Sequence, residues 1–198
     1  ASHQVRQRAV VARTNNGGND WNLQGPSNGT YRALSFVNAD TGFMAESFGT
    51  VYRTVNGGAA WTAFYNFPTA DIFWLYGVHF ADSRNGWAVG ASQVNGTNND
   101  GRVMRTRDGG VTWTRQLQSA QTLLACAFCD TLNGWCVGLN GAVFNTMDGG
   151  AAWNPETRGI TITLYSVFFA DSNCGWAVGG TSFDSAVILH TGNSGANW

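Results

Sequence analysis

The chain has 198 residues, and its 12% of charged residues compares with about 25% in an average domain, so long charged helices are not expected. Its net charge of -1 gives no basic excess, which argues against nucleic acid as a partner, and all 11 basic residues are arginine. No apolar run approaches the roughly 20 residues that span a bilayer, so we expect no transmembrane segment.

A two-part unit repeats along the chain. Its first part, Phe-x-Asp/Asn-x-x-x-Gly-Trp/Phe, occurs four times, beginning at Phe36, Phe80, Phe128 and Phe169. Its second part is an Asp-box corner, Thr-x-Asp/Asn-x-Gly-x-x-Trp, and occurs five times. Successive corners lie about 40 to 50 residues apart, which is the length of a four-stranded propeller blade.

The predicted elements follow in chain order. Residues 9–24 supply only the third and fourth strands of a blade, and complete repeats cover about 31–62, 75–114, 122–154 and 163–198. In the third repeat, period-two alternation predicts a strand up to Phe128, and Trp135–Gly138 and Ala142–Thr146 predict the next two strands. The turn between the first two uses Gly134 for any positive φ.

These signals predict an all-β fold, a single β-propeller domain of four-stranded antiparallel blades over residues 1–198. The chain is then part of a larger propeller, a ring of about five blades with one abbreviated, or an arc that a neighbouring molecule completes.

The Asp-box corners are expected to determine the fold and not to catalyse. In each corner the Asp or Asn side chain accepts local amides, glycine permits a tight turn, and the Trp covers it. The residues concerned are Asn16, Trp21, Asn56, Trp61, Asp108, Trp113, Asp148, Trp153, Asn193 and Trp198.

The joined repeat resembles that of the photosystem II stability and assembly factor family. The segments Gly86–Gly90 and Gly175–Gly179 both read Gly-Trp-Ala-Val-Gly, which is the family pattern, and Gly134–Gly138 differs from it once. The resemblance implies a propeller that binds membrane-protein assembly intermediates in the thylakoid lumen and has no catalysis of its own.

Arginines occupy one repeat position in succession. Arg13, Arg53 and Arg105 each precede an Asp-box Thr, where the later copies have Asn145 and His190. They match the arginine-rich patch with which the family meets its partner, and we take them as candidate partner-binding residues. The alternative is that each packs locally on a Trp or pairs with an Asp-box carboxylate.

The cysteines suggest one specific bond. Cys126 aligns with core positions of the other repeats. If the hairpin pairs symmetrically about its turn, Cys129 and Cys136 face each other, which predicts a disulfide and an oxidising compartment. Cys126 and Cys129 are three apart in a strand and point to opposite faces, so they make a poor metal chelate.

Two further features lie in loop-like stretches. Asn28 and Asn95 begin sequons and are glycosylation candidates, although a chain rich in Asn, Gly and Thr also produces sequons by chance. The insertion at 91–101 is predicted as a polar recognition loop.

The sequence supports no enzyme. Glu46 and Glu156 are the only glutamates, no carboxylate pair has a telling spacing, and the scattered histidines predict no metal site and no cofactor. We expect a non-catalytic scaffold or assembly factor outside the cytoplasm, in the thylakoid lumen, the periplasm or at the cell surface. Its partner is a protein, either a membrane-protein complex or copies of the chain itself. The alternatives are a secreted structural subunit that assembles through incomplete blades and, third, a glycan-binding or glycan-processing propeller.

Overall fold

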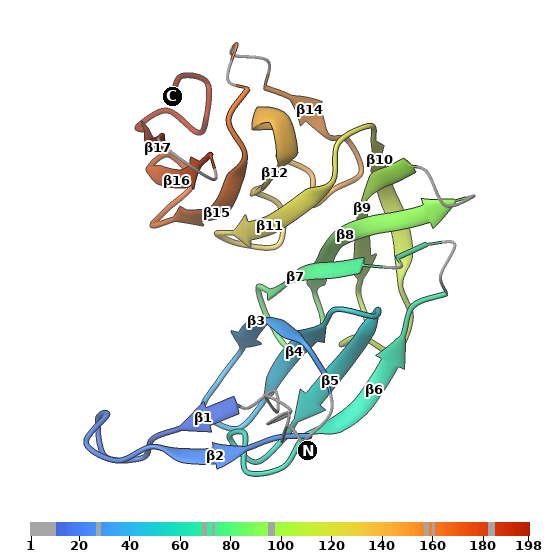
Figure 1. Cartoon of the computed structure of the whole chain (residues 1–198), viewed down its shortest axis with the longest axis vertical. Coiled ribbons are helices and arrows are strands. Elements are labelled where there is room, and N and C mark those ends of the chain that lie inside the picture. Colours follow the sequence, from blue (N-terminus) through green and yellow to red (C-terminus); the bar gives the residue numbers. More distant parts are fainter. Residues whose placement is uncertain are drawn as a thin grey trace, which may run out of the picture.

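The computed structural model describes residues 11–26, 29–68, 71–72, 74–94, 98–156, 159, 161–181 and 185–198. These residues form five antiparallel sheets that follow one another in chain order. In Figure 1 they trace an open arc from β1 at the lower left, through β7 and β8, to β17 at the upper left.

The strands fall into a two-stranded sheet and four blades, which we number I to IV. The two-stranded sheet contains β1 (Val11–Arg13) and β2 (Asn22–Gln24). Blade I contains β3 (Tyr31–Phe36), β4 (Gly42–Glu46), β5 (Thr50–Thr54) and β6 (Thr62–Asn66). Blade II contains β7 (Trp74–Phe80), β8 (Gly86–Val94), β9 (Asn98–Thr106) and β10 (Thr114–Ser119). Blade III contains β11 (Leu123–Phe128), β12 (Gly134–Gly138), β13 (Val143–Thr146) and β14 (Asn154–Pro155), with a 3-10 turn η1 (Leu139–Gly141). Blade IV contains β15 (Leu164–Phe169), β16 (Gly175–Gly180) and β17 (Ala186–Thr191).

The predicted all-β propeller architecture is confirmed. Within each blade the strands pair in sequence order, and the first strands of neighbouring blades, β3, β7, β11 and β15, contact one another. Among the described residues, the partial sheet has two strands and blade IV has three.

The turn between first and second strands is built by its Asp or Asn. The Oδ1 atom of Asp82 accepts the N–H groups of Arg84 and Asn85, both at 2.7 Å, and the other copies repeat this pattern. The sequence interpretation of Gly134 is wrong, because this glycine is not among the positive-φ residues. A Cβ there would lie 2.1 Å from the Phe128 ring, so the motif needs glycine for space.

The Asp-box corner has the same hydrogen bonds in all five copies. The Thr hydroxyl oxygen accepts the N–H of the glycine four residues later at 2.7–2.9 Å. The Asp or Asn Oδ1 accepts the N–H four residues after itself at 2.8–3.0 Å. These bonds satisfy the backbone where the chain leaves the sheet, which agrees with a structural role.

Aromatic pairs join the blades. The aromatic residue of the second strand in blades I to III stacks on the motif Phe of the next blade, with ring centroids 3.6 Å apart for Phe43–Phe80 and 3.5 Å for Trp87–Phe128 and Trp135–Phe169. The Asp-box Trp meets the edge of the same Phe, as Trp153 does on Phe128. The residues that recur in each repeat therefore form the interfaces between blades as well as the Asp-box corners.

The insertion at 91–101 extends a hairpin. β8 and β9 continue their pairing to Val94 and Asn98, and residues 95–97 lie outside the described part. The stretch predicted as a loop is therefore largely strand.

The predicted opposition of Cys129 and Cys136 is wrong. β11 and β12 pair Cys126 with Cys136, and the N–H of Cys129 donates to the Asn133 carbonyl at 3.0 Å instead. All four cysteines are free thiols in this structure. The hydrogen bond from Cys129 to Asn133 closes a shorter turn than one placed symmetrically around residues 130–134. The shorter turn changes which residues of β11 and β12 lie opposite each other.

Candidate functional site

Two of the three candidate arginines lie opposite the stacked aromatic residues, and Arg13 lies opposite Asn22. Arg53 pairs with Phe43 across β5 and β4, and Arg105 pairs with Trp87 across β9 and β8. Side chains that are directly opposite in an antiparallel pair share one face of the sheet. The arginine position is therefore part of the interface between blades.

Arg105 is held inside such an interface. It is 6% exposed, and its guanidinium carbon lies 5.2 Å from the centre of the Trp87 ring. On its other side it meets Gly149 of blade III, where a Cβ would lie 2.8 Å from both terminal nitrogens. Burial lowers the pKa of this guanidinium, with the nearby positive charge of Arg107 as a second cause. The burial of Arg105 favours the local-packing alternative for this residue.

Arg13 and Arg53 are more accessible. Both are half-buried, and Arg53 lies 5.0 Å from the centre of the Phe64 ring and 5.8 Å from that of Phe43. Among the described residues, no acceptor lies within hydrogen-bond distance of the Arg53 Nε atom. Within the described ranges, the one arginine–carboxylate ion pair joins Arg102 and Asp100 at 3.6 Å. The charges of Arg13 and Arg53 are thus not neutralised by a contacting carboxylate of the described chain.

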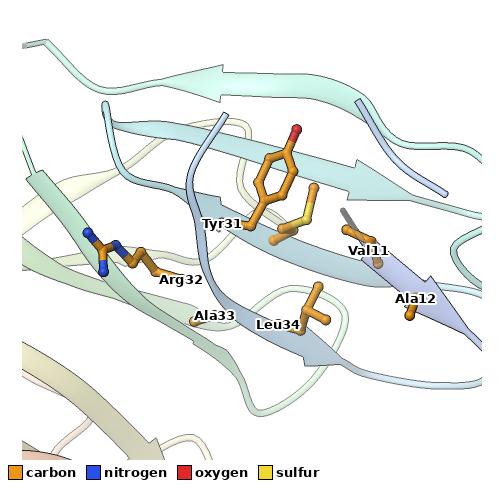
Figure 2. A pocket seen from close by; sticks show the side chains of 7 residues that line it. Val11, Ala12, Tyr31, Arg32, Ala33 and Leu34 are labelled. Carbon is orange, nitrogen blue, oxygen red and sulfur yellow. The ribbon is translucent and has the colours of Figure 1, made fainter. Parts of the chain in front are cut away.

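A cavity of about 260 Å³ lies between β1 and the first two strands of blade I. Figure 2 shows Arg32 pointing away from the other labelled side chains around it. The Tyr31 hydroxyl donates to the Pro26 carbonyl at 2.7 Å, and the remaining lining is apolar. The lining residues are Val11, Ala12, Tyr31, Arg32, Ala33, Leu34 and Met44. The Arg32 side chain turns away and donates from its Nε to the Ser47 hydroxyl at 2.9 Å, so the cavity is suited to an uncharged side chain.

At each end of the arc, the described structure contains only one of the two rings that stack between neighbouring blades. Trp176 of blade IV is 37% exposed, whereas its equivalents Trp87 and Trp135 are 0% and 1% exposed. Phe36 of blade I is 46% exposed, against 4% for Phe80. Trp176 is thus open on the side where a following blade would pack, and Phe36 on the side where a preceding one would. The apolar face around Trp176 continues over Phe168, Val178 and Ile188.

These open faces escaped the sequence prediction. Phe36 and Trp176 lie in the same sequence motif as their buried equivalents, so no neighbouring residue in the sequence distinguishes them. Only the incomplete repeats at both ends of the chain signalled that some faces would lack a neighbour.

The other candidate positions gather no further site. Glu46 is buried, and its carboxylate accepts the Phe48 N–H at 3.0 Å. Glu156 lies in a different blade and accepts from Asn145 at 3.1 Å. Over the described ranges, no three His, Cys, Asp or Glu side chains come together as a metal site. The glycosylation candidates Asn28 and Asn95 lie outside the described residues.

Comparison with known proteins agrees with the repeat. The sequence model of the family described as "Photosynthesis system II assembly factor YCF48" matches residues 114–198. The chain is a β-propeller repeat protein similar to the photosystem II assembly factors. The photosystem II assembly protein Ycf48 of Thermosynechococcus vestitus is 43% identical over 42 residues, which cover 21% of this chain and 12% of that protein.

Solved structures support the same fold. A structure described as YCF48 bound to D1 peptide superposes with a TM-score of 0.67 at 19% identity, and the match covers 84% of this chain. This chain spans 53% of the length of that one. The GH74 enzyme of Niastella koreensis also superposes, with a TM-score of 0.64 at 11% identity over 81% of this chain and 28% of the enzyme. At these identities the likeness shows the fold alone.

Helices are nearly absent from the part of the chain that the structure describes, and none there has the length and apolar character needed to cross a bilayer.

Proposed function

We propose that the chain is a non-catalytic propeller scaffold that acts as an assembly factor outside the cytoplasm by binding a segment of a partner protein. The observation that carries the proposal is Arg13 and Arg53, two half-buried guanidinium groups at equivalent repeat positions that no carboxylate of the described chain contacts, together with the cavity between β1 and blade I. Guanidinium groups donate charge-assisted hydrogen bonds to carboxylates and carbonyls, and the cavity takes an apolar side chain of the same segment.

The similar proteins support a peptide as the ligand. The solved relative is described as bound to a D1 peptide, and the matching family model describes a photosystem II assembly factor. A propeller offers a rigid arc of blades on which such a segment is bound without folding of the scaffold. A lumenal, periplasmic or cell-surface location belongs to this proposal.

The D1 peptide is the probe for the test. Fluorescence anisotropy with the labelled peptide measures Kd for the wild-type chain and for the double variant Arg13→Gln/Arg53→Gln. We expect the double variant to bind at least about 10-fold more weakly, because one charge-assisted hydrogen bond contributes about 1.5–3 kcal/mol. An unchanged Kd would remove these arginines from the interface, and no binding by the wild-type chain would remove a D1-like partner.

Two further arginines serve as controls. Arg115→Gln changes an exposed arginine on β10 and should leave both Kd and stability unchanged. Arg105→Gln should lower the thermal midpoint of unfolding, because Arg105 packs between Trp87 and Gly149. An Arg105 variant that keeps full stability and loses binding would show instead that Arg105 belongs to the binding surface.

A second candidate function is supported by Trp176 and Phe36. They are complementary halves of the stack that joins successive blades, so a structural subunit that assembles blade to blade would bury both. Native mass measured over a range of protein concentrations tests this function. Assembly that Trp176→Ala abolishes would favour it, and a monomer at all concentrations would exclude it.

The absence of catalysis is also tested directly. GH74 enzymes share the fold, and one from Xanthomonas campestris is described as a xyloglucanase, so xyloglucan and a wider glycan panel are the substrates to try. We expect no release of sugar, and release that Glu46→Gln or Glu156→Gln abolishes would contradict the non-catalytic function.

A further inference from the structure

Cys126 and Cys136 form a facing pair inside blade III. They are register partners on the neighbouring antiparallel strands β11 and β12. Both pack in the same cluster as Trp87 and Leu123, Cys136 fully buried and Cys126 partly buried. Cys129 packs in the cluster on the other side of the sheet, with Trp135. The two thiols therefore share a face that Cys129 does not reach.

The hydrogen-bond pattern shows which kind of pair they form. Bonded and non-bonded residue pairs alternate along an antiparallel ladder. The Cys129 N–H donates to the Asn133 carbonyl, so counting back through the register makes Cys126 and Cys136 a non-bonded pair. The pairing of β12 with its other neighbour, β13, leads to the same assignment. The Gly138 N–H donates to the Ala142 carbonyl, and the same alternation points the backbone groups of Cys136 toward β13.

Non-bonded pairs bring opposite residues closest. Their Cα atoms lie about 4.5 Å apart, with the side chains side by side. A disulfide requires Cα atoms about 4.4–6.8 Å apart and Cβ atoms that approach each other. The backbone of β11 and β12 meets the first requirement without movement of either strand.

We propose that Cys126 and Cys136 are a disulfide site, which closes when the chain folds in the presence of a disulfide oxidant such as oxidised glutathione or an oxidised protein dithiol. One cysteine thiolate attacks the oxidant and releases one thiol as a mixed disulfide forms. The second cysteine then attacks this bond and releases the other thiol. The two cysteines together lose two electrons and two protons, and the oxidant disulfide becomes two thiols.

Burial decides when the bond forms. It raises the pKa of Cys126 to about 12, and burial, with the neighbouring Cys126, also raises the pKa of Cys136. The thiolate is the attacking species, so oxidation of the folded chain is slow. During folding the same thiols are exposed and react before the blades close over them.

Refolding from urea in oxidised and reduced glutathione, followed by alkylation and chymotryptic digestion, tests the site. Cleavage after Phe128 and Trp135 separates the three cysteines of blade III onto different peptides. We expect one linked pair containing Cys126 and Cys136, with Cys129 and Cys174 alkylated. Four alkylated cysteines, or a link through Cys129, would overturn the proposal.

The repeat supplies matched controls. Val78 and Ala88 face each other at the equivalent positions of blade II, so Cys126→Val and Cys136→Ala should fold and leave all remaining thiols alkylated. Cys129→Ser/Cys174→Ser should form the bond as wild type does. Closing the loop between positions 126 and 136 should lower the unfolding equilibrium constant about 100-fold relative to the reduced chain. No difference between the two forms would mean that the bond strains the blade and is not part of the native fold.

Discussion

Trp135 and Trp176 occupy the same position of the repeat in two different surroundings, and replacing each with alanine measures what the interface between blades contributes. Trp135 is 1% exposed and stacks on Phe169 with ring centroids 3.5 Å apart. Its indole N–H donates to the Ser194 carbonyl at 3.2 Å. Trp176 is 37% exposed, and its nearest ring partners are Phe168 and His190 of its own blade.

The expected costs differ several-fold. Truncation of a buried Trp to Ala costs about 3–5 kcal/mol, and the carbonyl left without a donor adds about 1 kcal/mol, so Trp135→Ala should cost about 4–6 kcal/mol. Trp176→Ala loses mainly cross-strand contacts, so it should cost about 1–2 kcal/mol. Trp135→Phe keeps a stacked ring, as Phe43 does in blade I, and should cost about 1–2 kcal/mol.

The assay is urea unfolding of the reduced chain at low protein concentration, with the midpoint compared at equal m-value. Equal shifts for Trp135→Ala and Trp176→Ala would refute the reasoning, because they would mean that stacking between blades adds nothing to the contacts within a blade. A Trp176→Ala cost that grows with protein concentration would show instead that another molecule covers this face.

Three further substitutions test the motif residues. Gly134→Ala should lower the free energy of unfolding by at least about 1–3 kcal/mol, because its Cβ would overlap the Phe128 ring. The control Gly192→Ala should be nearly neutral, because no atom lies within 4 Å of a Cβ there. Thermal unfolding compares the two variants. Thr146→Val removes the hydroxyl oxygen that accepts the Gly150 N–H and should lower the free energy of unfolding, measured by urea unfolding, by about 1–3 kcal/mol. A change outside this range would contradict the corner description. Hydrogen bonds, of which those from Thr112 contribute most, lower the pKa of Asp108 to about 2. The stability that this carboxylate adds is therefore complete above its ordinary pKa and is lost as the pH falls through about 2. Asp108→Asn should therefore match wild type at neutral pH in thermal unfolding and lose less stability on acidification, and an equal loss would exclude this carboxylate as a cause.

Local chemistry was predictable from the sequence because its partners lie within a few residues. The Asp-box corner needs a hydroxyl, an Asp or Asn oxygen and glycine at fixed offsets, and Thr106 to Gly110 illustrate how completely those letters specify the bonds. The period of the repeat likewise predicted the blades, since each strand pairs with the next one along the chain.

The tertiary structure decided which copies of the same letters are buried and which side chains face each other. Trp135 and Trp176 differ only in whether another blade packs on them, and Arg105 is enclosed because blade III covers it. The pairing of Cys126 with Cys136 depends on a turn closed by Cys129 and Asn133, and a small change in that turn shifts every opposite pair in the hairpin. Contacts between blades and the register of a hairpin both join residues that no local motif connects, which is why the sequence by itself determined the blades and their corners but not these partners.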